Sequence, residues 1–204
     1  MRADARRNRD QIIVAAKQMF LEFGADVPME EIARQASVGV GTLYRRFPDR
    51  EALIRAVAQD NFGMVLAEAR AAAVEEPSAW DALVRLLSRS RELRLTVRLA
   101  LLSPLVWTIV RDDPKTGEVR DQIMAVLDDL VRAAQAEGTL RKDVGTGDVA
   151  VVCSVLLRRL HIGQHESADM ILDRALVLIL DGLRARPGTP LPGRPVTVTD
   201  LRGQ

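Results

Sequence analysis

The chain has 204 residues, of which 48% are hydrophobic, 28% are charged and 3% are aromatic, and its net charge at pH 7 is +1. This length and apolar content suit one or two domains with a sizeable core, and they exclude a chain that is disordered throughout. The nearly neutral balance excludes a globally basic protein, so any contact with nucleic acid must come from local clusters of positive charge.

No charged-then-apolar leader and no run of 18 apolar residues is present, which predicts a cytoplasmic chain outside the bilayer. The one cysteine, Cys153, lies in an apolar run and is expected to be an inert packing residue.

The amino terminus is predicted to be a flexible basic arm over residues 1–8, with a net positive charge. A helix is then expected from about Asn8 to Phe23, ended by Gly24 as its carboxyl-terminal cap. Its apolar stripe consists of Ile12, Ala16, Met19, Phe20 and Phe23.

The stretch from Pro28 to Phe47, PMEEIARQASVGVGTLYRRF, has the pattern of two short helices around a tight turn at Ser37-Val38-Gly39. Each helix has an apolar face, and the spacing is typical of a helix-turn-helix. The residues left pointing outward are Thr42, Arg45, Arg46 and the hydroxyl end of Tyr44. Arginine forks suit phosphates and guanine edges, and hydroxyl groups can bond phosphate oxygens, so we infer the DNA major groove as partner. Spacing alone also allows a helical hairpin of another kind of domain with a solvated basic end.

The segment from about Arg9 to Val57 resembles the amino-terminal domain of the TetR family of transcriptional regulators, most specifically through GVGTLYRRFPDREAL. The resemblance implies that Val40 to Phe47 reads the groove and that the helix beginning near Asp49 grips the DNA backbone. Two positions depart from the common pattern: Ser37 replaces a frequent glycine, and Met29 replaces a threonine that often contacts phosphate. We expect DNA contacts from Val40, Gly41, Thr42, Tyr44, Arg45, Arg46, Arg50, Arg6 and Arg7.

Beyond this motif the chain is predicted to remain helical. Asp49 is expected to cap a long helix that connects to the rest of the protein and ends near Ala73, and Ser78 is expected to cap the next one. Further apolar positions predict one or two helices before Pro104, and a regular amphipathic helix from about Gly117 to Ala136. The positions before Pro104 include Leu83, Leu86, Leu87, Leu95, Leu99 and Leu102.

The last two predicted helices, 149–160 and 168–183, are apolar nearly all round and need cover on more than one side. We expect that cover from the same helices of a second copy, in a two-fold four-helix interface, although a central core within one chain is an alternative. From Pro187 onward the many prolines and glycines predict a disordered tail.

The expected fold class is therefore all-α. An amino-terminal three-helix helix-turn-helix domain (1–60, with the connecting helix to about 73) precedes a carboxyl-terminal helical effector-binding and dimerisation domain (78–186) and the tail (187–204).

No catalytic constellation, phosphate loop or paired-cysteine motif is present, so we expect neither an enzyme nor a cofactor. His161 and His165 lie four residues apart with Glu166 beside them, but no further ligand follows at suitable spacing, and we expect no metal site.

The family resemblance implies a small-molecule effector held within the carboxyl-terminal helices. The candidate residues are Trp80, Arg91, Arg94, Arg98, Trp107, Met124 and His161. The three arginines share one helix face and suit an anionic effector, although such a stripe is also typical of solvated surface.

These expectations predict a homodimeric repressor that leaves a palindromic operator when its effector binds. Two other functions remain open: a helical carrier or enzyme whose helix-turn-helix is vestigial, and a protein that coats DNA without sequence preference.

Overall fold

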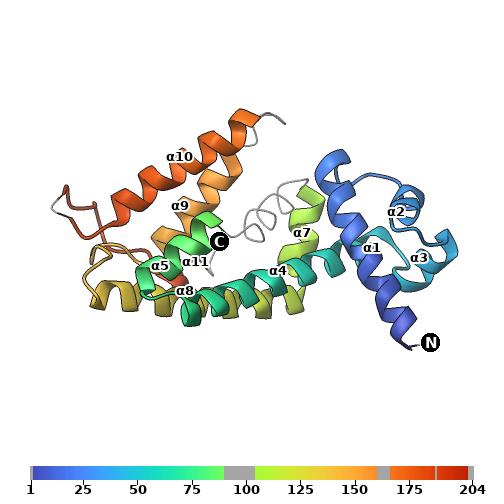
Figure 1. Ribbon diagram of the computed structural model, residues 1–204, viewed down its shortest axis with the longest axis horizontal. Helices are drawn as coiled ribbons and strands as arrows, with labels where there is room; N and C mark the ends of the chain where they lie inside the picture. Colours follow the sequence, from blue (N-terminus) through green and yellow to red (C-terminus); the bar gives the residue numbers. More distant parts are fainter. Residues whose placement is uncertain (1, 90–103, 160–165, 187, 202–204) are drawn as a thin grey trace. The chain divides into compact units, whose positions relative to one another are not determined.

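The computed structural model describes residues 2–89, 104–159, 166–186 and 188–201. Every regular element within those ranges is a helix, which confirms the all-α fold class (Figure 1). Within the described ranges, no helix has both the length and the apolar character needed to cross a membrane. The predicted helix positions Leu95, Leu99 and Leu102 lie outside the described residues.

The chain forms two compact units, one made of residues 1–63 and 98–119 and the other of residues 64–97 and 120–204. Helices α4 (Arg50–Glu75) and α8 (Pro114–Ala136) each contribute to both units. The segment that contains α7 (Pro104–Asp112) belongs to the first unit, whereas the predicted domain boundaries placed it in the second domain.

The first unit is built around α1 (Arg2–Phe23), α2 (Met29–Gln35) and α3 (Val40–Arg46). Helix α1 starts at Arg2, so the prediction of a flexible arm over residues 1–8 was wrong: polar residues at that end continue the helix. Its predicted stripe is buried except for Phe23, which is 61% exposed beside the helix end at Gly24. The core of this unit includes Ile12, Ala16, Phe20, Ile32, Ala33, Leu43, Phe47, Leu53 and Val57.

Capping side chains fix several helix starts where the sequence predicted them. The Asp49 carboxylate accepts a hydrogen bond from the Ala52 amide (2.7 Å), and the Ser78 hydroxyl accepts one from the Asp81 amide (3.0 Å) at the start of α5 (Ala79–Val84). Helix α8 begins at Pro114, earlier than the predicted start at Gly117, because Asp113 caps it through the Thr116 amide (2.9 Å).

The second unit packs α5 and a π-helical turn (Arg85–Arg89) with α8, α9 (Thr146–Arg159) and α10 (Glu166–Leu183). Its core is one apolar cluster that includes Trp80, Leu83, Leu86, Leu87, Leu127, Leu130, Val131, Leu140, Val149 and Leu180. Gly138, with φ +73°, ends α8 close to the predicted position.

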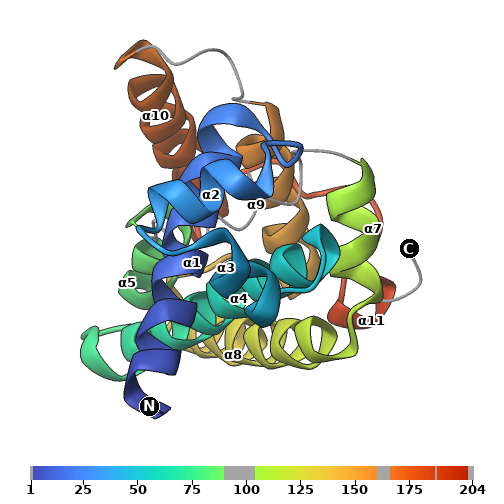
Figure 2. The same ribbon diagram turned by 90° about the vertical axis from the view of Figure 1, so that its right-hand side faces the viewer.

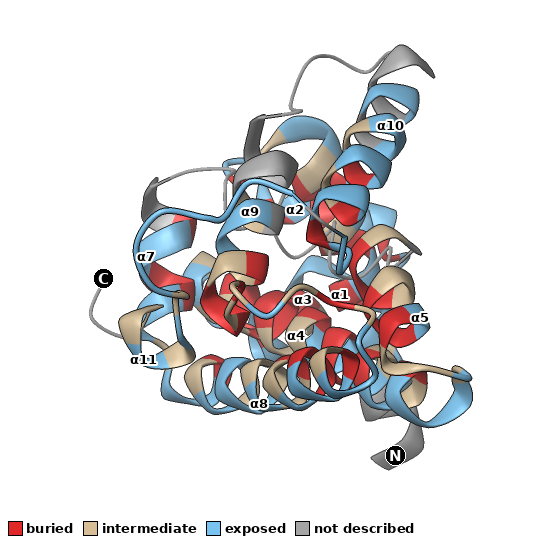
Figure 3. Ribbon diagram, turned by 90° about the vertical axis from the view of Figure 1, so that its left-hand side faces the viewer, coloured by how far each residue is buried: buried red, intermediate tan, exposed pale blue. Residues whose placement is uncertain are grey.

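Helices α9 and α10 contact each other but leave apolar side chains uncovered. Leu178 is 72% exposed and Met170 is 58% exposed, and exposed positions follow much of α10 (Figure 3). Among the side chains of these helices that the structure describes, the other exposed apolar residues are Val151, Val152, Ile171 and Val177. Within the described residues, these apolar side chains of the two helices are therefore left without cover.

The last described segment differs from the disordered tail that the sequence predicted from residue 187 onward. Residues 188–201 follow a defined path that ends in the short helix α11 (Val198–Leu201), and α11 contacts α9. The tail is proline-rich and cannot form long regular structure, but its main chain finds hydrogen-bond partners on other segments.

Candidate nucleic-acid interface

Helices α2 and α3 and the turn between them form the helix-turn-helix that the sequence predicted (Figure 2). The turn depends on Ser37, whose φ of 55° lies in the left-handed region, at a cost of about 1 kcal/mol for a residue with a side chain. The Val38 amide then donates to the Ala33 carbonyl (3.0 Å), which closes the end of α2. Ala33 itself is fully buried, and its small side chain lets the two helices approach.

Helix α3 has one buried anchor and an exposed outer face. Leu43 is fully buried and Phe47, just after the helix, is 4% exposed, so both hold α3 on the domain core. Thr42 is half-buried, and the remaining predicted contact residues of this helix are exposed: Val40, Gly41, Tyr44, Arg45 and Arg46. The outer face of α3 is thus exposed and accessible to a partner.

The Tyr44 hydroxyl is held by a neighbouring carboxylate. It donates a hydrogen bond to Glu30 Oε1 on α2 (3.1 Å), and this bond raises the pKa of Tyr44 above its usual value. The hydroxyl therefore stays protonated at neutral pH and is oriented in the absence of DNA. Sequence reasoning missed Glu30, because two residues on different helices cannot be paired from spacing alone.

Arg50 lies at the start of α4 and faces inward. Its Nη1 donates to the carbonyl oxygens of Ala25 and Val27, both at 2.6 Å, and so ties α4 to the loop between α1 and α2. These contacts give the guanidinium a role within the domain, and its predicted contact with the DNA backbone stays a prediction.

The start of α2 carries acidic side chains and a buried methionine. Met29 is 5% exposed, so its side chain belongs to the core and does not replace the phosphate-binding threonine. Glu30 and Glu31 follow in the first turn, where carboxylates stabilise a helix, and Glu31 forms an ion pair with Arg34. Of the two predicted arm contacts, Arg7 is exposed on α1, and Arg6 belongs to the same helix, although its side chain is outside the described residues.

Of the predicted effector residues, Trp80, Trp107 and Met124 lie within the described part of the chain. Trp80 is 4% exposed in the core of the second unit, and the Arg184 guanidinium lies 4.5 Å from the centre of its ring. Met124 packs partly buried against the same core, whereas Trp107 is 44% exposed on α7 in the first unit. The other candidates, Arg91, Arg94, Arg98 and His161, lie outside the described residues. Within the described residues no cluster of three acidic, histidine or cysteine side chains could hold a metal ion.

A second polar junction in the first unit was not predicted. Asp113, between α7 and α8, accepts hydrogen bonds at Oδ2 from the Thr116 hydroxyl (2.6 Å) and from Gln59 Nε2 on α4 (3.0 Å). The helix that leaves the helix-turn-helix is thus fastened to the turn at the end of α7.

Two family models match the chain. Residues 12–57 match a model described as bacterial regulatory proteins, tetR family, and residues 78–185 match the C-terminal domain of SbtR-like transcriptional regulators.

Solved structures and curated proteins agree with these models. A TetR transcriptional regulator from Streptomyces coelicolor is 32% identical, with a TM-score of 0.68, and the match covers 86% of this chain and 98% of that one. A TetR regulatory protein from Mycobacterium vanbaalenii is 34% identical, with a TM-score of 0.62 and coverage of 90% and 98%. An HTH-type transcriptional regulator of Staphylococcus aureus (strain USA300) is 42% identical over 60 residues, which are 29% of this chain and 32% of that protein. The chain thus spans about a third of the length of the curated relatives that it matches.

Proposed function

Because this chain belongs to the TetR family of transcriptional regulators, we propose that it is a ligand-responsive repressor that leaves a palindromic operator when a small effector binds. The observation that carries this proposal is helix α3, which is anchored by Leu43 and presents Tyr44, Arg45 and Arg46 to solvent. A short helix of this kind fits the major groove, where arginine can read guanine and Thr42 can contact a thymine methyl group. The protein would act in the cytoplasm, where its DNA target lies.

The operator should be a palindrome because the protein should act as a homodimer. The exposed apolar residues of α9 and α10, which include Leu178, fit a self-complementary four-helix interface with a second copy. A two-fold dimer presents two α3 helices to half-sites about one helical turn, roughly 34 Å, apart.

The route from effector to DNA would run through α4. Gln59 on α4 is hydrogen-bonded to Asp113, so a shift of α7 is transmitted to the helix that follows the helix-turn-helix. A coupling free energy of about 1 to 3 kcal/mol between effector and DNA would reduce operator affinity by about 5 to 150-fold.

The effector would bind among the carboxyl-terminal helices. Met124 is the described candidate there that is only partly buried, and Arg91, Arg94, Arg98 and His161 stay predictions. Trp80 would contribute to the effector site as part of the surrounding core, because the Arg184 guanidinium already covers its ring. Trp107 lies on α7, the helix whose shift would be transmitted to α4.

The test is a selection of bound sequences from random duplex DNA by the full chain, repeated with Thr42→Ala and Arg45→Ala. The expected result is a palindrome for the original chain and altered base preference at defined positions for the two variants, because base contacts carry specificity. Glu22→Gln, an exposed change elsewhere in the same unit, should leave the palindrome unchanged. Enrichment of no sequence, with affinity that depends only on salt, would instead identify a nonspecific DNA-coating protein.

A further inference from the structure

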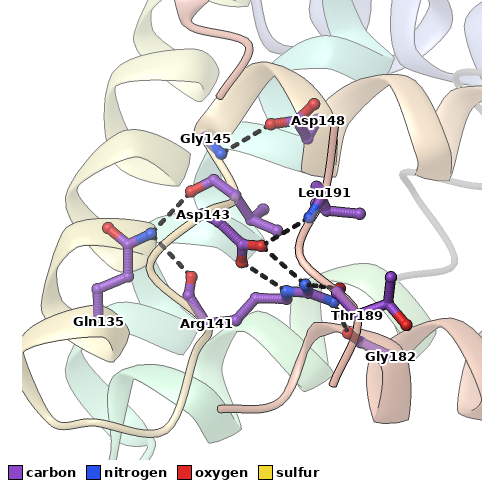
Figure 4. Close-up of polar contacts among 9 residues, drawn as sticks. Gln135, Arg141, Asp143, Gly145, Asp148, Gly182, Thr189 and Leu191 are labelled. Carbon is purple, nitrogen blue, oxygen red and sulfur yellow. Dashed lines mark hydrogen bonds and ion pairs between the residues drawn. The ribbon is translucent and has the colours of Figure 1, made fainter. Parts of the chain in front are cut away.

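The last described segment of the chain, residues 188–201, lies against the connection between α8 and α9 (Figure 4). We call this segment the C-terminal strap. It follows the region matched by the carboxyl-terminal family model, which ends at residue 185, so the family match says nothing about its role.

The strap supplies hydrogen-bond partners to the first turn of α9. The Gly147 amide donates to the Val196 carbonyl (2.8 Å), and the Val196 amide donates to Asp148 Oδ2 (2.9 Å). The same carboxylate oxygen accepts the Gly145 amide (2.8 Å). The first amides of a helix have no partners within the helix, so the strap acts as a cap supplied from the far end of the chain.

An ion pair anchors the middle of the strap. Arg141 and Asp143 pair in the loop before α9 (2.6 Å), and Asp143 also accepts the Leu191 amide (3.1 Å). Arg141 donates to the Thr189 carbonyl (3.0 Å) and to the Gly182 carbonyl at the end of α10 (3.2 Å). The hydrogen bonds from Arg141 and the Leu191 amide hold the pKa of Asp143 well below its usual range, so its carboxylate is ionised at neutral pH. One pair of side chains thus joins the strap, the loop and α10, as the labelled residues in Figure 4 show.

The surface beneath the strap has no room for a side chain at Gly145 or Gly147. A Cβ atom on Gly147 would lie 2.5 Å from Val196 Cγ1 and 2.8 Å from the Thr197 carbonyl oxygen, and one on Gly145 would collide with the Val196 carbonyl. Two glycines separated by one residue therefore let the strap's main chain reach the helix end. Such a close fit is typical of a built contact between segments rather than of a loosely attached tail.

The strap is also closed on itself. The Arg194 guanidinium binds both carboxylate oxygens of Asp200, each at 2.7 Å, and the Thr197 amide donates to Asp200 at the start of α11 (2.8 Å). This internal pairing brings Val196 to the helix end in one conformation.

We propose that the C-terminal strap is a built-in clamp that caps α9 and joins it to α10, and so holds the two helices in the arrangement that binds a second copy. The part that concerns the second copy rests on the homodimer proposed above, whereas the capping of α9 does not. The strap would then control self-association from outside the apolar face itself.

The test uses full-length variants on either side of the contact. Gly147→Ala places a methyl group under the strap. Asp200→Ala removes the pairing with Arg194 inside the strap and leaves α9 unchanged, so any effect of this variant cannot come from damage to α9. Gly117→Ala is the matched control, because a Cβ atom there meets no neighbouring atom. Amide hydrogen exchange over residues 144–152 measures the cap, and sedimentation equilibrium measures the dimer.

In Gly147→Ala and Asp200→Ala, we expect amide exchange over residues 144–152 to become about tenfold faster. The dimer dissociation constant of both variants should rise about tenfold. Gly117→Ala should change neither quantity. Unchanged exchange in both variants would overturn the clamp. Faster exchange with an unchanged dissociation constant would overturn its control of the dimer. If the original chain is a monomer at every concentration, the proposed homodimer fails, and the exchange measurement still decides whether the strap caps α9.

Discussion

The Arg50 guanidinium joins α4 to the loop that precedes α2 through two hydrogen bonds. Its two hydrogen bonds are charge-assisted and reach partly buried carbonyls, so Arg50→Ala should lower the free energy of unfolding by about 2 kcal/mol. Arg46→Ala is the matched control, because Arg46 is exposed and should affect DNA affinity without changing stability. Denaturant unfolding of both variants measures the difference. If Arg50→Ala and Arg46→Ala were equally stable, and Arg50→Ala weakened binding to all DNA sequences uniformly, the result would instead support the phosphate contact that the sequence predicted for Arg50.

Glu30 places a negative charge beside the exposed face of α3, where DNA phosphates should approach. Replacement by glutamine keeps an acceptor for the Tyr44 hydroxyl and removes the charge. Glu30→Gln should therefore tighten DNA binding by about threefold at 0.1 M salt, with a smaller gain at higher salt because exposed charges are screened. Fluorescence anisotropy titrations at two salt concentrations measure this effect. Glu22→Gln, which removes an exposed charge from α1, should give a smaller gain, and an equal gain would show that only net charge matters.

The turn between α7 and α8 depends on the ionised form of Asp113. Partial burial raises the pKa of this carboxyl, but the hydrogen bonds from Thr116 and Gln59 outweigh burial and lower the pKa below its usual value. A lowered pKa in the folded state means that Asp113 stabilises the fold above the unfolded pKa of about 3.9, and that this contribution is lost as the pH falls through the folded value.

Asp113→Ala should therefore lower the free energy of unfolding by about 1 kcal/mol at pH 7, as expected for a lost helix cap. The difference from the original chain should shrink as the pH falls toward 3, because protonation removes the same interaction. Denaturant unfolding at several pH values follows both effects. Asp112→Ala is the control, since its carboxylate is exposed and pairs with the exposed Arg111, and it should leave stability nearly unchanged. A difference that grows on acidification would contradict this account.

Elements whose signals are local could be predicted from the sequence. The Ser37 turn, the caps Asp49 and Ser78 and the buried face of α3 all depend on residues within a few positions of one another. Contacts between distant segments could not be predicted in the same way. The Glu30 to Tyr44 bond and the Arg50 contacts join different helices, and composition gives no sign of them.

The strap shows the same limit at the scale of the whole chain. Proline and glycine are typical of disordered tails, and the residues that order this one, Arg141, Asp143 and Asp148, lie about 50 positions earlier. Taken alone in the sequence, each of those residues is typical of an ordinary loop or of the start of a helix. Only the fold brings them to the strap.

At the scale of the assembled molecule, the exposed apolar face of α10 should decide whether two subunits associate. Leu178→Asp puts a charge where 72% of a leucine is exposed in the single chain, so the subunit should fold normally. In a dimer the same charge would be buried without a partner, and the dissociation constant should rise by at least about 100-fold, or about 2.7 kcal/mol. Val74→Asp is the matched control, because Val74 is 85% exposed at the end of α4, outside α9 and α10. Sedimentation equilibrium should show a monomer for Leu178→Asp and a dimer for Val74→Asp, and binding to a two-half-site operator should weaken only in the first. A dimer that survives Leu178→Asp, or that Val74→Asp disrupts equally, would place the interface elsewhere.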